Sequence, residues 1–117
     1  MRQLLARKNK AAWIAEAGQH LVGFSILAWS GPKAALAAYL ETIEVLAEYR
    51  GRGLGRELLM RCEASAVEAG VGAIALHVDA ENSAAIRMYE SLGYRYVARE
   101  EDFYPLGRAA LIYRKPL

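Results

Sequence analysis

Residues 45–55 read VLAEYRGRGLG, and this stretch decides the fold because it joins a strand-like run to a long amphipathic segment. Its three glycines, at every second position, carry no Cβ, so the chain can turn sharply and an anion can approach the main chain closely. A helix that follows presents unpaired N–H groups and about half an elementary charge at its first turn. The stretch therefore predicts a pyrophosphate-binding loop. The loop residues are Arg50, Gly51, Arg52, Gly53, Leu54, Gly55 and Arg56.

Two better-known glycine loops do not fit this spacing. A Walker loop ends in Gly-Lys-Ser/Thr, whereas Gly55 is followed here by Arg56 and Glu57. A dinucleotide-binding fingerprint needs a third glycine at position 56 or 58, where Arg56 and Leu58 stand. The pattern that remains is Arg-x-x-Gly-x-Gly between a strand and a helix. A basic turn that only caps the helix is the structural alternative.

The composition indicates a single globular domain spanning residues 1–117. With 117 residues the chain holds one core, and 55% hydrophobic with 24% charged residues is typical of a packed protein. A net charge of +2 is too small to indicate nucleic-acid binding. The single cysteine, Cys62, excludes an internal disulfide and a cysteine metal cluster, and its place on an apolar helix face predicts a core residue. The chain shows neither a signal peptide nor an apolar run long enough to span a membrane, which predicts a cytoplasmic protein.

Hydrophobic periodicity predicts a strand-rich first part followed by an α/β part. A hairpin is expected around residues 18–20, and a turn cluster at residues 29–33. Asn82 or Ser83 is the expected cap of the second helix. The predicted strands are 11–17, 21–28, 39–46, 74–78, 94–99 and 109–114, and the predicted helices run from Leu54 to just before Gly70 and over 84–92.

Residues 76–94, LHVDAENSAAIRMYESLGY, form a second motif: a strand, then Asn-x-x-Ala-x-x-x-Tyr, then a glycine stop. Together with the loop at 50–55, this motif resembles the GNAT acetyltransferase superfamily. Within it the chain is most similar to the N-terminal (Nα) acetyltransferases, including the bacterial type that acetylates a ribosomal protein at its terminal alanine. Their Tyr-Tyr-Pro turn corresponds to Phe103-Tyr104-Pro105. The resemblance implies an α/β GNAT fold whose mixed central sheet contains splayed parallel strands.

The resemblance also implies acetyl-CoA as cosubstrate, no metal, and a set of cofactor-binding residues. Main-chain groups of Val45 and Leu46 would bind the acetyl and pantetheine portion, and the loop from Arg50 to Arg56 would hold the pyrophosphate. Asn82 would bind the pantetheine arm and Tyr89 would sit beside the sulfur. Each assignment has a structural alternative, because Asn82 also suits a helix N-cap and the helical spacing of Tyr89 also suits a core residue.

Amide formation from a thioester needs a neutral amine and a proton for the departing thiolate. An α-amine has a pKa of about 7.7–8.0 and lysine about 10.4, a gap of roughly 2.5 units or about 3.4 kcal/mol. A histidine therefore matches an α-amine better than a lysine amine. The resemblance places His77 at the catalytic base position, Tyr39 as a partner that orders a water, and Tyr89 as the general acid.

Other residues are expected on the acceptor side of the site. Glu41 and Glu44 are rival bases because both lie on the predicted strand 39–46. Glu41, Phe103 and Tyr104 are the expected substrate-contacting residues. The acidic pair that follows the Tyr-Tyr-Pro turn in the bacterial type is missing here, where Gly107-Arg108 leads into Ala109.

One departure from the superfamily concerns the front of the chain. GNAT domains usually begin with a strand and one or two helices, and residues 1–10 are expected to be at most the tail of that region. The domain is thus expected to be N-terminally shortened, with an exposed sheet edge that a homodimer would cover.

The function expected from the sequence is acetyl-CoA-dependent N-acetylation of a primary amine, foremost a protein N-terminal α-amine. A small-molecule amine acetyltransferase and a non-catalytic acyl-CoA-binding module are the alternatives. Neither nucleic acid nor membrane is an expected partner.

Overall fold

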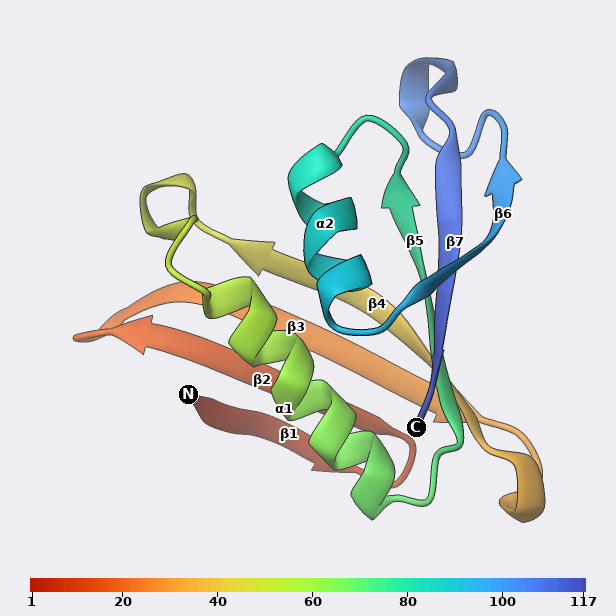
Figure 1. The fold of residues 1–117 in the computed structure, drawn as a ribbon. Coiled ribbons are helices and arrows are strands. Elements are labelled where there is room, and N and C mark those ends of the chain that lie inside the picture. The colour runs from red at the N-terminus through yellow and green to blue at the C-terminus, as the bar shows by residue number, and fades with distance from the viewer.

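The computed structural model describes residues 1–117 and contains one seven-stranded sheet with two α-helices on one side of it (Figure 1). The strand order is β1-β2-β3-β4-β5-β7-β6, and only β4 and β5 pair in parallel. The strands are β1 (Arg2–Arg7), β2 (Lys10–Ala17), β3 (His20–Ser30), β4 (Ala37–Val45), β5 (Ala73–Asp79), β6 (Arg95–Glu100) and β7 (Ala110–Pro116). The helices are α1 (Leu54–Glu68) and α2 (Ser83–Ser91). The mixed α/β architecture predicted from the sequence is confirmed.

The predicted elements occur with small shifts at their ends. The β2–β3 hairpin turns at Gly18, whose φ of 62° lies in the left-handed region that glycine adopts without strain. β3 continues through Trp29 and Ser30, so the predicted turn at residues 29–33 begins two residues too early. The strand continues because Trp29 pairs with Ala38 of β4 and its indole is buried in the core.

The first ten residues differ from the expectation, because they form a strand rather than a tail. β1 pairs antiparallel with β2, from Arg2 opposite Ile14 to Arg7 opposite Lys10, and only two residues join the strands. The sheet therefore has a strand before β2, where the sequence analysis expected none. No helix stands between β1 and β2. All but one of its residues are exposed, so the sequence carries no clear alternating pattern.

The pairing of β1 with β2 also bears on the predicted homodimer. The edge that a homodimer was expected to cover belongs to β2, and β1 occupies that edge within the same chain. A homodimer remains a prediction, without support from an unpaired β2.

The core lies between α1 and the sheet. The helix buries Leu58, Leu59, Cys62 and Ala66 against β2, β3 and β4. Cys62 is a core residue, as predicted, with its Sγ 3.1 Å from the Oγ of buried Ser25. Burial raises the pKa of the Cys62 thiol to about 11, which keeps it protonated and unreactive at neutral pH.

The sheet has a helix side and a far side, and the alternation of β5 side chains separates them. Ile74, Leu76 and Val78 belong to the core cluster that includes Leu59 of α1, so they lie on the helix side. Ala75, His77 and Asp79 therefore project from the far side. Both helices lie on the same side of the sheet (Figure 1).

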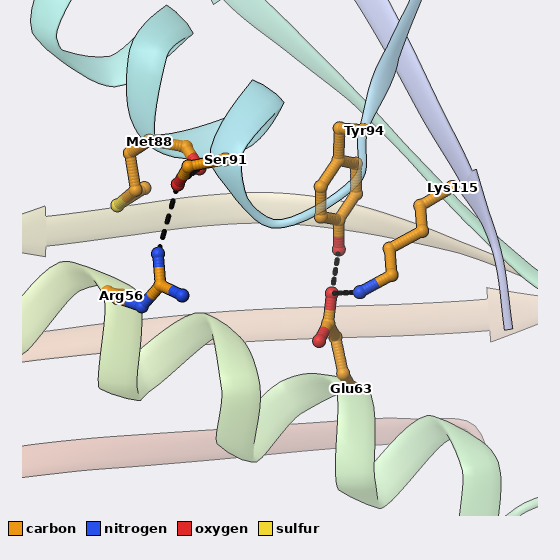
Figure 2. Close-up of polar contacts among 6 residues, drawn as sticks. All are labelled: Arg56, Glu63, Met88, Ser91, Tyr94 and Lys115. Carbon is orange, nitrogen blue, oxygen red and sulfur yellow. Dashed lines mark hydrogen bonds and ion pairs between the residues drawn. The ribbon is translucent and has the colours of Figure 1, made fainter.

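Polar contacts connect α1 to the end of α2 and to β7 (Figure 2). Arg56 donates to the Ser91 Oγ at 3.0 Å. Further along α1, Glu63 Oε2 accepts hydrogen bonds from the Tyr94 hydroxyl at 2.8 Å and from Lys115 Nζ at 3.0 Å. The Glu63 side chain is only 14% exposed, so these partners replace the water that it loses on folding.

The Glu63→Ala variant is expected to lower the free energy of unfolding by about 1–3 kcal/mol, because the buried Tyr94 hydroxyl and the Lys115 ammonium lose their acceptor. The matched control is Glu57→Ala on the same helix. Glu57 forms an exposed pair with Arg61, and such pairs contribute only about 0.3–0.5 kcal/mol. Urea unfolding measures both variants, and equal losses would contradict the assignment.

Candidate active site

The site begins where the two parallel strands separate. β4 and β5 pair only at three positions, ending with Tyr39 opposite Ala75. Just beyond, Leu40 pairs with Leu27 and Thr42 with Ile26 of β3, which leaves Glu41 as an extra, bulged residue. A bulge bends its strand. β4 therefore diverges from β5 and opens a gap in the sheet, as the predicted splayed strands require.

A cavity of about 760 Å³ occupies this gap and is lined from both sides of the sheet. From the helix side, Val78 of β5 and Met88 and Tyr89 of α2 border it. From the far side, Glu44 of β4 and His77 of β5 border it. Because β4 and β5 do not pair beyond Tyr39 and Ala75, residues from both sides of the sheet can reach the space between these strands. The opening thus runs through the sheet.

The glycine loop lies at the helix-side mouth of this cavity. Gly51 and Gly53 have φ values of 77° and 80°, and a Cβ at either position would meet no atom within 4 Å. Gly53 is the N-cap of α1 and provides no side-chain cap. The first helical hydrogen bond runs from Glu57 N to Gly53 O, so the amides of residues 54–56 precede it. This is the geometry of an anion-binding helix N-terminus.

Two of the three predicted loop arginines border the cavity. Arg50 does so while its Nε donates to the Val45 carbonyl at 2.9 Å. Arg56 also borders it and is held by Ser91 (Figure 2). Arg52 lies outside the lining, with its guanidinium 5.0 Å from the centre of the Tyr49 ring.

Most of the other predicted cofactor-binding residues also line the cavity, and one does not. Val45 and Leu54 line the cavity. Leu46 does not line it. The Leu46 N–H donates to Val22 O and the Leu46 carbonyl accepts from Tyr49 N, each at 2.9 Å. Asn82 lines the cavity and caps α2, since its Oδ1 accepts from Ala85 N at 3.1 Å. A cap and a ligand contact are compatible, because the cap uses only the amide oxygen.

Tyr89 presents a phenol to the cavity from the helix side. Its side chain is 4% exposed and packs edge-on against Tyr94, with 5.9 Å between ring centres. Burial, together with smaller effects of the nearby Tyr104 and Glu44, raises the pKa of the Tyr89 hydroxyl to about 12. The group therefore stays protonated at neutral pH and is a hydrogen-bond donor.

On the far side, His77 is the centre of a connected cluster. Its Nδ1 lies 2.8 Å from the Tyr39 hydroxyl and its Nε2 lies 3.1 Å from Glu100 Oε2. The Phe103 ring stacks on the imidazole at 4.1 Å between centres and an interplanar angle of 5°. The structure thus brings together three predicted residues. It adds Glu100, which no local sequence motif marks.

The remaining acceptor-side residues lie around this cluster. Glu41 borders the cavity but pairs with Lys10 Nζ at 3.1 Å, whereas Glu44 borders it without an ion pair. Tyr104 also lines the cavity.

A second contact that sequence analysis missed joins Arg108 Nε to Asp79 Oδ2 at 2.7 Å and ties the β6–β7 loop to β5. The hydrogen bond from the Glu81 amide lowers the pKa of Asp79, and the bond from Arg108 lowers it further. The carboxylate therefore stays charged at neutral pH.

A sheet opened between two parallel strands, with a glycine loop and helix N-terminus at the opening, is the arrangement that the resemblance to the GNAT acetyltransferases predicts. The sequence profile of the acetyltransferase (GNAT) family matches residues 1–94, and the chain belongs to this family. No helix is long and apolar enough to cross a membrane.

Individual relatives agree with this assignment. The [ribosomal protein bS18]-alanine N-acetyltransferase of Escherichia coli is 40% identical over 68 residues, which are 58% of this chain and 46% of that protein. Its crystal structure superimposes with a TM-score of 0.82 at 28% identity and covers 95% of this chain and 71% of that one. A mycothiol acetyltransferase of Corynebacterium aurimucosum is 33% identical over 86 residues, which are 70% of this chain and 28% of that protein. The matched sequence segments thus span less than half the length of these two relatives.

A third similar protein was solved with a bound ligand. Naa50 of Arabidopsis thaliana, solved in complex with the bisubstrate analogue CoA-Ac-MVNAL, superimposes with a TM-score of 0.82 at 25% identity. The superposition covers 92% of this chain and 72% of that one.

Asn82→Ala is expected to lower the free energy of unfolding by about 1 kcal/mol, because α2 loses its N-cap acceptor. Asn82→Asp is the matched variant, since a carboxylate oxygen caps the same amide and should keep the stability. Chemical denaturation of both proteins measures the difference. A loss in Asn82→Asp as large as that in Asn82→Ala would contradict the capping role.

Proposed function

We propose that the protein is an acetyl-CoA-dependent N-acetyltransferase that acts on a primary amine. The observation that carries this proposal is the cavity through the sheet. Tyr89 borders it from the helix side, and His77, joined to Tyr39, borders it from the far side. An acyl donor entering from one side and an amine entering from the other would meet in the gap between β4 and β5.

The helix-side mouth fits acetyl-CoA. The uncapped N-terminus of α1, the open space at Gly51 and Gly53, and the guanidinium groups of Arg50 and Arg56 suit a pyrophosphate. Asn82 and Val45 line the path between this mouth and Tyr89 and would contact the pantetheine arm. When bound, acetyl-CoA supplies an acetyl group activated as a thioester.

Tyr89 would stabilise the charge that develops on the sulfur as the carbon–sulfur bond breaks. A hydroxyl with a pKa of about 12 remains a donor, whereas complete proton transfer to a thiolate with an ordinary pKa of about 8.5 is uphill by roughly 3.5 units. That difference corresponds to roughly 5 kcal/mol, at about 1.4 kcal/mol per unit. The contribution of Tyr89 is therefore greatest as a hydrogen bond formed in the transition state.

His77 and Tyr39 would accept the proton that the amine gives up on the far side. A histidine with an ordinary pKa near 6.5 suits an α-amine whose pKa is about 7.7–8.0. Glu44 is the alternative base, because it borders the cavity and forms no ion pair. Glu41 is less suited, since Lys10 neutralises it.

A protein N-terminal α-amine is the leading acceptor in this proposal. The 40% identical relative is named as an alanine N-acetyltransferase, and the ligand of Arabidopsis Naa50 joins CoA to a short peptide. A small-molecule amine is the second candidate, supported by the similarity to a mycothiol acetyltransferase. A non-catalytic acyl-CoA-binding module is the third, and the cavity-lining Tyr89 argues against it. A homodimer and a cytoplasmic location stay predictions.

Calorimetry and a thiol-release assay together test the proposal. Acetyl-CoA should bind the unmodified protein, and thiol should be released with short peptides bearing a free N-terminus faster than with N-blocked, lysine-containing peptides. The Gly53→Val variant should not bind, since φ of 80° is strained for a β-branched residue and the side chain would fill the phosphate site. Its fold is checked by circular dichroism. Binding without turnover on any amine would favour the non-catalytic module.

Tyr89→Phe removes only a hydroxyl and should leave the affinity for acetyl-CoA nearly constant while kcat falls by about 10²- to 10³-fold, the usual effect of losing one transition-state hydrogen-bond donor. The control is Tyr113→Phe, whose hydroxyl bonds to Glu90 and does not border the cavity. Steady-state kinetics and calorimetry on both variants separate catalysis from binding. Full activity in Tyr89→Phe would remove this residue from the mechanism.

A further inference from the structure

We propose that Glu44 and Phe24 form a subsite that binds a second positive charge of the acceptor, apart from the amine that is acetylated. The subsite rests on the proposed acetyltransferase function and narrows its acceptor to amines that carry a further ammonium or guanidinium group. The free charge of Glu44, the aromatic ring opposite it and the hollow that both residues line carry the proposal.

The acceptor side of the cavity has one charge without a partner. Its carboxylates belong to Glu41, Glu44 and Asp79. Glu41 pairs with Lys10, and Asp79 pairs with Arg108. Glu44 borders the cavity and forms no ion pair. The uncompensated charge that an acceptor meets on this side is therefore negative, and a cation complements it.

The Phe24 ring stands beside this carboxylate. Phe24 lies opposite Glu44 in the pairing of β3 with β4. The next pair, Ser25 with Ile43, faces α1, because the Ser25 Oγ contacts Cys62. Alternation therefore directs both Phe24 and Glu44 to the far side. The Cβ atoms of such a pair lie about 5 Å apart, so a cation at the carboxylate is also within reach of the ring.

Both residues line a second hollow, of about 240 Å³, which adjoins the main cavity. The two spaces share Glu44, Val45 and Arg50 as lining residues. Leu21 and Leu46, which are 52% and 49% exposed, add apolar surface to the hollow. Apolar walls with a carboxylate suit a group that has a methylene stem and a charged head, as lysine and arginine side chains have.

Arg50 is the one cation on the walls of this hollow. Its Nε donates to the Val45 carbonyl at 2.9 Å, and the residue also belongs to the glycine loop. In the proposed complex the pyrophosphate of acetyl-CoA offsets the guanidinium charge. The second cation of the acceptor should therefore bind more tightly once CoA is in place.

The register of the strands sets the spacing between the two positive groups. β4 and β5 run in parallel from the last pair, Tyr39 with Ala75, toward the opening. With the bulged Glu41 left out, Glu44 stands four positions beyond Tyr39, or about 13 Å at 3.3 Å per residue. His77 stands two positions beyond Ala75, or about 7 Å. The subsite is thus about 7 Å farther along the strands than the proposed base.

This spacing identifies two sources for the second charge. One is a peptide whose α-amine reacts and whose second residue is lysine or arginine. The other is a small diamine such as 1,4-diaminobutane. A diamine with adjacent amino carbons is too short to reach both groups.

NMR titration of the CoA-saturated protein tests the subsite without any turnover. Three peptides are compared that differ only in the second residue, which is lysine, norleucine or glutamate after an N-terminal alanine. The lysine peptide should bind at least about 5-fold more tightly than the norleucine peptide, the upper end for an exposed ion pair. Added salt should reduce this preference, and removal of CoA should weaken the binding of the lysine peptide. The pair 1,4-diaminobutane and butylamine tests the small-molecule source in the same way.

Variants assign the preference to the two residues. Glu44→Gln should abolish the preference for lysine, Glu44→Lys should reverse it toward glutamate, and Phe24→Leu should reduce it by about 2- to 5-fold. The matched control is Glu48→Gln, because Glu48 is exposed and lines neither space. It should retain the full preference. Circular dichroism confirms that each variant is folded.

Equal affinities of the lysine and norleucine peptides, together with equal affinities of the diamine and butylamine, would overturn the subsite. So would an unchanged preference in folded Glu44→Gln. Failure of CoA to bind would instead contradict the proposed function, and the comparison of peptides can still be made without CoA. The two failures are therefore distinguishable.

Steady-state kinetics separate this role of Glu44 from that of a base. The subsite predicts that Glu44→Gln lowers the ratio of kcat/KM for the lysine peptide to that for the norleucine peptide by about 5-fold or more. A base would be lost equally for every acceptor. An equal fall in kcat/KM with all three peptides would therefore contradict the subsite and assign Glu44 to proton transfer.

Discussion

The bulge at Glu41 is the constraint on which the site depends. It ends the pairing of β4 with β5 after Tyr39 and turns a continuous sheet into one with an opening. Without the opening, Tyr89 and His77 would be separated by a layer of main chain, since they lie on opposite sides of the sheet. A local change of one residue in strand register thus creates the only route by which both can border one cavity.

The two sides of the opening differ in how their side chains are held. On the helix side, Arg56 joins α1 to Ser91 of α2, and Glu63 of α1 holds the Tyr94 hydroxyl (Figure 2). The Tyr94 ring in turn packs edge-on against Tyr89. On the far side no helix covers the sheet, and the β6–β7 loop supplies the cover. Phe103 stacks on His77, and Arg108 anchors the loop to Asp79. The acceptor side is therefore built by long-range contacts of one loop.

Features that depend on residues close together in the sequence could be predicted, whereas contacts between residues far apart in the sequence could not. The glycine loop, the Asn82 cap and Tyr89 lie within motifs of a few residues, where local geometry determines the role. Glu100 reaches His77 across 23 positions and Arg108 reaches Asp79 across 29, through strand pairings that no local pattern encodes. β1 was missed because it buries almost nothing.

The base proposed for the site bears on how an acceptor would be selected. A histidine base discriminates amines by basicity, because it accepts a proton from a neutral amine but does little to deprotonate an ammonium of high pKa. The difference between an α-amine and a lysine amine is about 3.4 kcal/mol, or roughly 300-fold in the neutral fraction. Since every 1.4 kcal/mol is a factor of ten, this term exceeds what one added methylene contact contributes to specificity, about 1–3 kcal/mol. In the proposed mechanism the amine's pKa therefore discriminates more strongly than the fit of any single methylene group to the cavity.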